Sequence, residues 1–416
     1  MWFLDFHFIM NNLCHLWVWI LAQLYKFVKR RLILVGFGSF TSFTLLTILL
    51  KWSFTCSNIQ PEKYVKNICS DYHSGTSIGN LCDELCNPDG ISSISCHNFH
   101  TSKEAVFSGI HGSHSVVFKL PRKISNHEVL HWLDNSTKKI YPSDIDFTNM
   151  IITNVKLKFN IFLNNIDAKR MSHINYSLNH HHREIEMENV WNLLQDNEYL
   201  ALLLYEQFDI FPHLEGSCGS LYAVQKLNTI SRYWHLITLY DSKSEWVKRV
   251  KLSVMILDFL SRLDHGLPEP LHICDIKMDH FGVTNDFKKI KYLDLDSVHP
   301  LSVTNKLTAD GSDCKQHSDC DFKDCRSFCN LMTFKCQHGV ANNNLQIVCE
   351  KIFLGWVLSG RVMVPGLLVG PRSPRVLIDV LELCANPDVE SGTPRAPASK
   401  EIRNRLHKLL SHLSLS

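Results

Sequence analysis

The chain has 416 residues, of which 45% are hydrophobic, a content typical of globular proteins and enough for one large two-lobed domain or two ordinary ones. The formal net charge is +2, and acidic and basic residues are mixed along the chain without a long block of either sign. Because nucleic-acid binding depends on a basic stripe that neutralises phosphates, this pattern excludes nucleic acid as an expected partner.

The first expected element is a membrane-spanning helix over residues 32–50, a run without a charged side chain and about as long as a bilayer crossing requires. Basic residues flank this run unequally, with Lys26, Lys29, Arg30 and Arg31 before it and only Lys51 close behind it. Since basic residues stay cytoplasmic, we expect residues 1–31 to be a cytoplasmic tail, residues 32–50 a signal anchor, and the rest lumenal, as in a single-pass type II protein. A cleaved signal peptide is the alternative, but no small-residue cleavage pattern follows the run.

The cysteines fit this topology. Of the 15 cysteines, only Cys14 precedes the expected span, which leaves an even number on the oxidising side, where disulfides form. Two sequons, at Asn135 and Asn175, predict glycosylation on the same side. Zinc is the alternative use of the cysteines, but the sequence contains no paired C-x-x-C knuckles.

Most of the cysteines fall into two clusters that we expect to be disulfide-bonded. The first lies in a lumenal collar over residues 51–100, expected to have little periodic structure, and consists of Cys56, Cys69, Cys82, Cys86 and Cys96. The second lies in an insertion over residues 314–336 and consists of Cys314, Cys320, Cys325, Cys329 and Cys336. Too few apolar residues surround the second cluster for it to fold without bridges. Its aspartates raise the alternative of a calcium loop, but the central Gly and terminal Glu of an EF-hand are missing.

Between and after the clusters, hydrophobic periodicity predicts an ordered α+β domain with a lobe over residues 101–226 and a second lobe over residues 227–416. In chain order, we expect strands at 114–120, 220–224, 271–275 and 291–295. Helices are expected at 186–205, 246–263, 345–358 and 401–413. A turn containing Gly216 and Gly219 precedes the second strand, and Gly266 and Pro268 end the second helix.

This order of elements is typical of a protein kinase, so each part of a phosphoryl-transfer site can be sought. Lys119 ends a Val-Val-Phe-Lys strand, where a kinase holds the nucleotide phosphates, and Glu198 on the following helix is its expected partner, with Glu188 as the alternate. The loop around Asp275 and Lys277 resembles the kinase catalytic loop, with Asp275 as the base.

Asp294, in Tyr-Leu-Asp-Leu-Asp, takes the place of the metal-binding Asp of a kinase. The glycine-rich loop is poorly matched, because residues 109–113 read Gly-Ile-His-Gly-Ser rather than G-x-G-x-x-G.

Four further stretches resemble the divergent protein kinase domain family, also called family with sequence similarity 69. They are Tyr64, Cys69, Tyr72, Gly75, Gly79, Leu81, Cys82 and Cys86; Trp191 to Gln195 with Asn197 and Glu198; Cys218, Gly219, Leu221 and Tyr222; and Cys320, Cys325, Arg326, Cys329, Lys335 and Cys336. The resemblance covers roughly residues 64–354. It implies a type II membrane protein of the endoplasmic reticulum with a two-lobed, disulfide-rich, kinase-like lumenal domain.

Two departures from that family bear on metal binding. Where members can carry an EF-hand-like insertion, this chain has three histidines at 180–182 instead of alternating aspartates, so no calcium is expected; a solvated loop is preferred over a transition-metal site there. In the catalytic loop, His280 replaces the metal-binding Asn, and imidazole suits manganese or zinc better than magnesium. Asp279 and Asp296 are candidates to compensate.

Three hypotheses follow. The chain is an active lumenal kinase that uses ATP with Mg²⁺ or Mn²⁺, with Lys119 and Glu198 at the nucleotide, Asp294 and His280 at the metal, and a protein or glycan hydroxyl as acceptor. Alternatively it is a pseudokinase that acts as a membrane-anchored binding or scaffold module, which the changed metal ligand and the poor glycine loop favour. The third reading is a structural disulfide-rich ectodomain.

Overall fold

The structure is a computed structural model that describes residues 41–42, 44–45, 59–87, 90–96, 103–112, 114–122, 130–133, 139–172, 180–233, 241–308, 311–358 and 361–415. Nearly all of the expected span over residues 32–50 therefore lies outside the described residues, as do Cys56, Asn135 and Asn175. No helix within the described ranges has the length and apolar character needed to cross a membrane.

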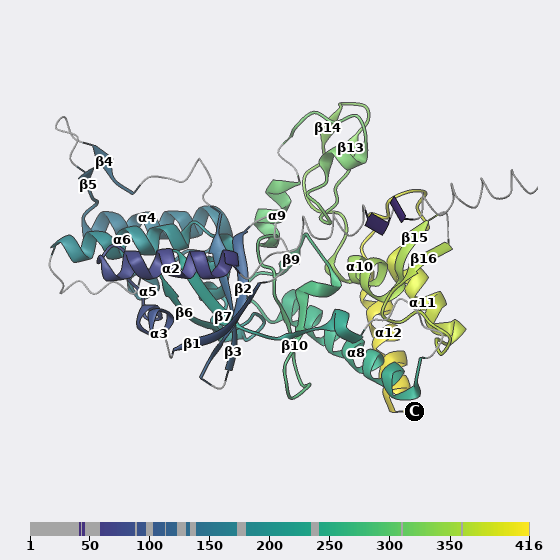
Figure 1. Ribbon diagram of the computed structural model, residues 1–416. Coiled ribbons are helices and arrows are strands. Elements are labelled where there is room, and N and C mark those ends of the chain that lie inside the picture. Colours follow the sequence, from purple (N-terminus) through teal and green to yellow (C-terminus); the bar gives the residue numbers. More distant parts are fainter. Residues whose placement is uncertain are drawn as a thin grey trace, which may run out of the picture. The chain divides into compact units, whose positions relative to one another are not determined.

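Five antiparallel strands form the sheet that carries Lys119 (Figure 1). In spatial order they are β1 (Ile91–Cys96), β2 (Lys103–His111), β3 (His114–Pro121), β7 (Leu221–Gln225) and β6 (Leu214–Cys218). The strands expected at 114–120 and 220–224 correspond to β3 and β7. Of residues 109–113, considered for the glycine loop, Gly109 to His111 form the end of β2, and residue 113 lies outside the described residues.

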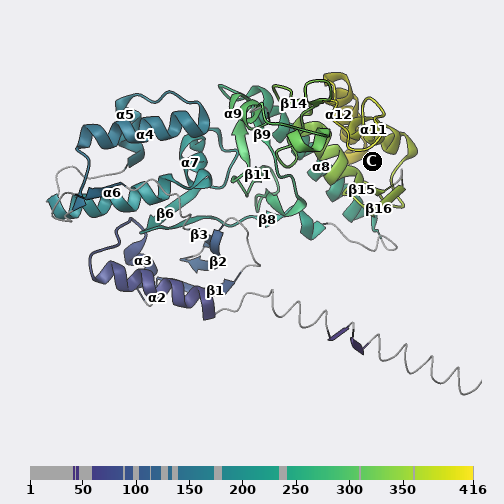
Figure 2. The same cartoon turned by 90° about the horizontal axis from the view of Figure 1, so that it is seen from above.

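The side-chain alternation of the strands sorts apolar residues onto two faces of this sheet. In β7, Leu221 and Ala223 belong to the core that includes the collar, whereas Tyr222 and Val224 belong to the main core on the other face. Figure 2 shows the sheet between these two layers of helices. In β3 the same alternation directs Val116 and Phe118 to the collar side and leaves Lys119 for the opposite side.

The collar was expected to be irregular, and this expectation is wrong. It contains α2 (Ile59–His73), α3 (Cys82–Cys86) and the edge strand β1, and both helices pack on the sheet. The Cys82–Cys218 disulfide bonds α3 to β6, so the collar is covalently part of the lobe. Cys218 lies 136 residues from Cys82 in the sequence, so the local composition of the collar did not predict this disulfide.

The other face of the sheet is covered by four helices, which are α4 (Asp144–Phe159), α5 (Asn165–Ser172), α6 (His180–Leu194) and α7 (Asn197–Leu204). The helix expected over 186–205 is broken between α6 and α7. The break arises because the side chain of Asp196 accepts a hydrogen bond from the Tyr199 amide at 2.8 Å and caps a new helix. The histidines at 180–182 begin α6 rather than lie in a loop.

The second lobe is built around α8 (Lys243–His265), whose buried apolar residues recur at helical spacing. It packs against α12 (Lys400–Leu415), which in turn contacts α11 (Arg375–Ala385). The remaining helices and strands are short: β4 (Trp132–Leu133), β5 (Lys139–Ile140), β8 (Asn228–Thr229), β9 (Leu271–Ile273), β10 (Phe281–Val283), β11 (Ile290–Tyr292), β12 (Val298–Pro300), α9 (Leu301–Leu307), β13 (Cys329–Asn330), β14 (Lys335–Cys336), α10 (Asn344–Val348), β15 (Gly355–Leu358) and β16 (Arg361–Pro365).

The buried helix expected over 345–358 is only partly present. Helix α10 continues as a π-helical segment, η6 (Cys349–Leu354), and the chain then turns into β15, which pairs with β16. Gly355 has a φ of 98°, and a Cβ there would lie 2.2 Å from the carbonyl oxygen of Val364. Only glycine fits this turn, so the helix ends before it.

Candidate nucleotide and phosphoryl-transfer site

Lys119 and Glu198 form the ion pair expected for a kinase N-lobe. Lys119 points from β3 toward α7, where its Nζ contacts Glu198 Oε1 and donates a hydrogen bond to the carbonyl oxygen of Leu293 at 2.9 Å. Burial raises the pKa of the Glu198 carboxyl to about 7, although its lysine neighbours favour the charged form. The alternate, Glu188, instead accepts a hydrogen bond from the Tyr141 hydroxyl at 2.9 Å.

A second group of side chains lies close together and consists of Asp275, His280 and Asp294. One side-chain donor atom from each lies within 4.8 Å of the others. His280 Nε2 lies 3.3 Å from Asp294 Oδ2, and its Nδ1 lies 3.1 Å from the Asp275 carbonyl oxygen. Burial lowers the pKa of His280 despite the nearby Asp294 carboxylate, which favours a neutral ring able to bind a metal. The Tyr292 hydroxyl donates to the same Asp275 carbonyl at 2.6 Å and so fixes the loop.

Lys277 lies beside Asp275, with 2.9 Å between its Nζ and Asp275 Oδ2, and is half exposed. A second lysine, Lys323 of the insertion, approaches the same oxygen at 3.7 Å. Burial by itself would raise the pKa of the Asp275 carboxyl, but Lys277 and Lys323 hold it below its usual range. Asp275 is therefore ionised at neutral pH and able to accept a hydrogen bond from an acceptor hydroxyl.

Sequence reasoning missed Lys103, the first residue of β2. Its side chain is 3% exposed, and its Nζ lies 2.7 Å from Asp196 Oδ2, 2.7 Å from Asp296 Oδ1 and 3.3 Å from Glu198 Oε2. Asp196, the cap of α7, was missed as well, whereas Asp296 was considered as a compensating ligand. The only sequence signal for Lys103 is a lysine shortly before the apolar residues Ala105 to Phe107, a weak pattern on its own.

Most of these residues line one pocket with an apolar and a polar part, whereas Asp275, Lys277 and Asp196 lie outside its described lining. The apolar wall comes from Val106, Val117, Val224, Leu227 and Leu293, and the polar part from Lys103, Lys119, Glu198, His280, Asp294 and Asp296. Gln225 lines the same pocket, and its Oε1 is buried without a hydrogen-bond partner among the described residues. The segment that joins β1 to β2, residues 97–102, contains no glycine and lies outside the described residues.

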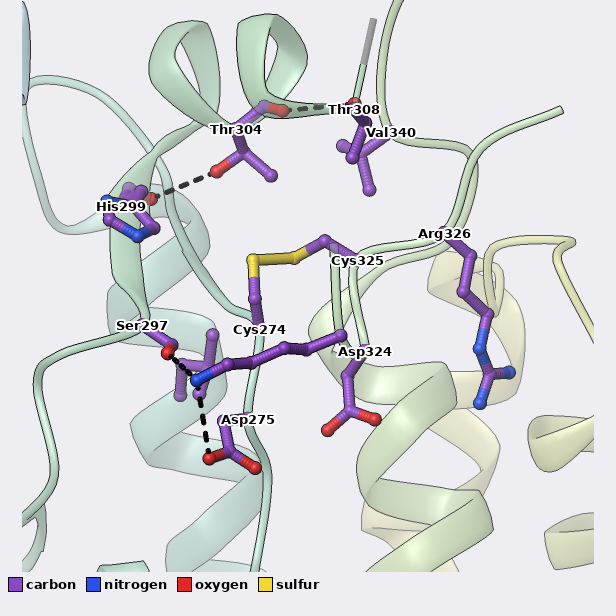
Figure 3. Close-up of a disulfide and its surroundings, with 12 residues drawn as sticks. Cys274, Asp275, Ser297, His299, Thr304, Thr308, Asp324, Cys325, Arg326 and Val340 are labelled. Carbon is purple, nitrogen blue, oxygen red and sulfur yellow. Dashed lines mark hydrogen bonds and ion pairs between the residues drawn. A yellow bond between two sulfur atoms is a disulfide. The ribbon is translucent and has the colours of Figure 1, made fainter. Parts of the chain in front are cut away.

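A disulfide anchors the catalytic loop to the cysteine-rich insertion (Figure 3). Cys274, next to Asp275, is bonded to Cys325, which was expected to form a disulfide but whose partner the sequence did not predict. Asp324 adds two hydrogen bonds to the loop: its amide donates to the Cys274 carbonyl at 2.8 Å, and its Oδ2 accepts from the Ile276 amide at 2.7 Å. The ammonium of Lys323 donates a hydrogen bond to the Ser297 hydroxyl at 2.6 Å and lies 3.7 Å from Asp275 Oδ2.

Three of the other disulfides join cysteines within the two expected clusters. Cys69 is bonded to Cys86, Cys314 to Cys329, and Cys320 to Cys336, and Cys96 is also disulfide-bonded. The Cys349–Cys384 bridge was not expected. Cys314, Cys320 and Cys329 lie close enough to hold a metal, but their sulfurs are engaged in disulfides. The aspartates of the insertion bind protein groups, for example Asp321 with Arg395.

Comparison with known proteins places the chain in a family. Residues 22–173 match a family model described as the N-terminal cysteine-rich endoplasmic-reticulum region of FAM69, and residues 190–387 match one described as the protein-kinase domain of FAM69. Among solved structures, the complex of Rv3197 with erythromycin from Mycobacterium tuberculosis aligns at 10% identity over 92% of this chain and 93% of that chain, with a TM-score of only 0.26. The two family matches together span most of the sequence, and the chain therefore belongs to the FAM69 family of divergent, kinase-like proteins.

Proposed function

We propose that the chain is a nucleotide-dependent phosphotransferase that moves the γ-phosphoryl group of ATP to a hydroxyl of a protein or glycan. The observation that carries this proposal is one pocket lined by Lys119, its partner Glu198, His280 and Asp294, with a donor atom of Asp275 within 4.8 Å of those of His280 and Asp294. A lysine for the phosphates, a carboxylate for the acceptor and acidic metal ligands are the parts that phosphoryl transfer requires.

In this proposal, Asp275 orients the acceptor hydroxyl and takes up its proton. The acceptor oxygen forms a bond to the γ-phosphorus while the bond from that phosphorus to the β,γ-bridging oxygen breaks, and ADP leaves. Lys119 holds the phosphates, and its contact with Glu198 and the Leu293 carbonyl fixes its position. Lys277, beside Asp275, is placed to neutralise charge on the transferred group.

The donor set fits a divalent cation. Asp294 and Asp275 offer carboxylate oxygens, and His280 offers a ring nitrogen within the same 4.8 Å. Oxygen ligands suit Mg²⁺ and Mn²⁺ alike, but the imidazole favours Mn²⁺. The bound ion would neutralise the phosphates; Asp294 and His280 would hold it there.

The pocket also fits an adenine ring. Aliphatic side chains from β2, β3 and β7, together with Leu227 and Leu293, form an apolar wall suited to a flat heterocycle. The Oε1 of Gln225, which has no hydrogen-bond partner among the described residues, can accept a hydrogen bond from the amino group of adenine, which would satisfy an otherwise costly buried oxygen.

We also propose that the chain acts in the lumen of the endoplasmic reticulum as a single-pass type II glycoprotein. The description of the matching cysteine-rich family model supports the compartment, and the disulfides agree with an oxidising environment. The topology rests on the basic residues before residues 32–50, and glycosylation rests on the Asn135 and Asn175 sequons.

A pseudokinase that binds partners without catalysis is the second candidate. His280 in place of an amide ligand favours it, as does the absence of glycine from residues 97–102. Glycines in that loop allow the backbone to approach the phosphates of a nucleotide.

Thermal unfolding of the purified full-length chain with ATP and Mg²⁺ or Mn²⁺ separates these functions. We expect stabilisation by nucleotide and Mn²⁺ that is lost in Lys119→Met and in Asp294→Asn. The control is Lys291→Met, which removes a buried lysine paired with Asp209 at 2.5 Å outside the pocket. Labelled γ-phosphate should then appear on an acceptor. Stabilisation without transfer would favour the pseudokinase, and no stabilisation with either metal would refute nucleotide binding.

A further inference from the structure

We propose that Lys103 occupies a cation position between Glu198, Asp196 and Asp296 and thereby limits the site to one divalent ion. Two groups of donor atoms share Asp294: the Asp275–His280–Asp294 group on one side, and Glu198, Asp294 and Asp296 on the other. Protein kinases commonly bind two ions at the phosphates. The inference rests on the proposed nucleotide site, which it makes more specific.

The contacts of Lys103 support an ionic rather than a packing role. Its ammonium donates to Asp196 and Asp296 at 2.7 Å each and contacts Glu198 at 3.3 Å, with the side chain 3% exposed. Two of these three partners belong to the second donor group. Burial alone would lower the pKa of the Lys103 ammonium, but the three carboxylates raise it, so the group stays charged.

The charge balance of the site leads to the same conclusion. When all four are ionised, the carboxylates of Asp196, Glu198, Asp294 and Asp296 exceed the two ammonium groups, Lys103 and Lys119, by two negative charges. One divalent cation neutralises that surplus. Without Lys103 the surplus is three, and buried carboxylates without a counterion are strongly unfavourable.

The side of Asp294 on which the ion binds then follows. The ammonium of Lys103 already takes one oxygen of Glu198 and one of Asp296, and a divalent ion among the same oxygens would be repelled by it. On the Asp275–His280 side the described lysines near Asp275 are much less buried, because the side chains of Lys277 and Lys323 are 55% and 49% exposed. The single ion is therefore expected at Asp294 and His280, on the side of Asp294 that faces Asp275.

Counting bound Mn²⁺ on the full-length chain tests this inference without nucleotide. Titration of MnCl₂, followed by electron paramagnetic resonance, should give one saturable ion for the unaltered chain and a second for Lys103→Met. In the double variant Lys103→Met/Asp296→Asn, one donor of the vacated group is gone, and the count should return to one. Lys291→Met, the matched loss of a buried paired lysine, should leave the count at one.

Two ions on the unaltered chain, or an unchanged count in Lys103→Met, would overturn the inference. If Lys103→Met does not fold, Asp296→Asn alone decides, because our assignment leaves Asp296 outside the ion's ligands. Its Mn²⁺ affinity should stay within about twofold of that of the unaltered chain, and a tenfold loss would contradict the assignment. Failure of ATP to bind would refute the proposed function instead. The number of bound Mn²⁺ ions is measured without nucleotide and would still test the role of Lys103.

Discussion

Removing the Cys274–Cys325 disulfide should increase the local opening of the loop around Asp275, in addition to lowering the free energy of unfolding of the whole fold. The perturbation is the double substitution Cys274→Ala/Cys325→Ala, which avoids placing hydroxyls in a buried site. The bridge closes 51 residues, and in the chain-entropy description its loss lowers the free energy of unfolding by about 4 kcal/mol. The bridge also holds Asp324 against the backbone on both sides of Asp275.

A matched control exists in the same lobe. The Cys349–Cys384 bridge is equally buried and closes 35 residues, so its removal should also lower the free energy of unfolding by about 4 kcal/mol. It joins η6 to α11 and has no contact with the catalytic loop among the described interactions. The two double variants should therefore be similarly destabilised in urea unfolding.

Hydrogen exchange and phosphoryl transfer then separate the two effects. The Ile276 amide, which donates to Asp324, should lose protection in Cys274→Ala/Cys325→Ala and keep it in Cys349→Ala/Cys384→Ala. If the chain transfers phosphate, kcat should fall only in the first variant, with nucleotide affinity retained. Equal protection of Ile276 in both variants would show that the disulfide acts through global stability alone, and the reasoning would be refuted.

Three further predictions concern the pocket and its surroundings. Gln225→Leu removes the expected acceptor for adenine, so the Kd for ATP should rise about fivefold while the Kd for GTP changes little; an equal change for both would argue against this contact. His280→Asn supplies an amide oxygen, and the rate with Mg²⁺ relative to Mn²⁺ should rise roughly tenfold, the effect of about 1.4 kcal/mol in ion binding; an unchanged ratio would exclude His280 as a ligand. Burial lowers the pKa of His299 from 6.5 to about 4, so the folded state binds fewer protons than the unfolded state between these pH values. The contribution to the free energy of unfolding, about 3 kcal/mol, is therefore fully present above pH 6.5 and is lost as the pH falls toward 4. In urea unfolding, the free energy of unfolding of His299→Phe should depend less on pH over that interval, and an unchanged pH dependence would contradict the prediction.

The sequence predicted correctly those features that depend on neighbouring residues or on the order of residues along the chain. Periodic apolar residues predicted β3, β7 and α8, and the order of Lys119, Glu198 and Asp294 along the chain predicted three side chains that line one pocket. It failed where the interaction is long-range. Lys103 meets Asp296 across 193 residues of sequence, and Cys82 meets Cys218 across 136, and neither pairing leaves a local pattern.

The amino-acid sequence by itself determined the α+β, kinase-like character of this chain, its content of disulfides and the candidate residues of the proposed site, because periodicity, spacing and side-chain chemistry are local properties. Only the tertiary structure decided that the collar is part of the sheet, that Cys274 is bonded to the insertion, and that a second lysine lies among the carboxylates. These features depend on which strands and loops become neighbours when the core closes, and burial then sets the charge state of groups such as Glu198 and His280.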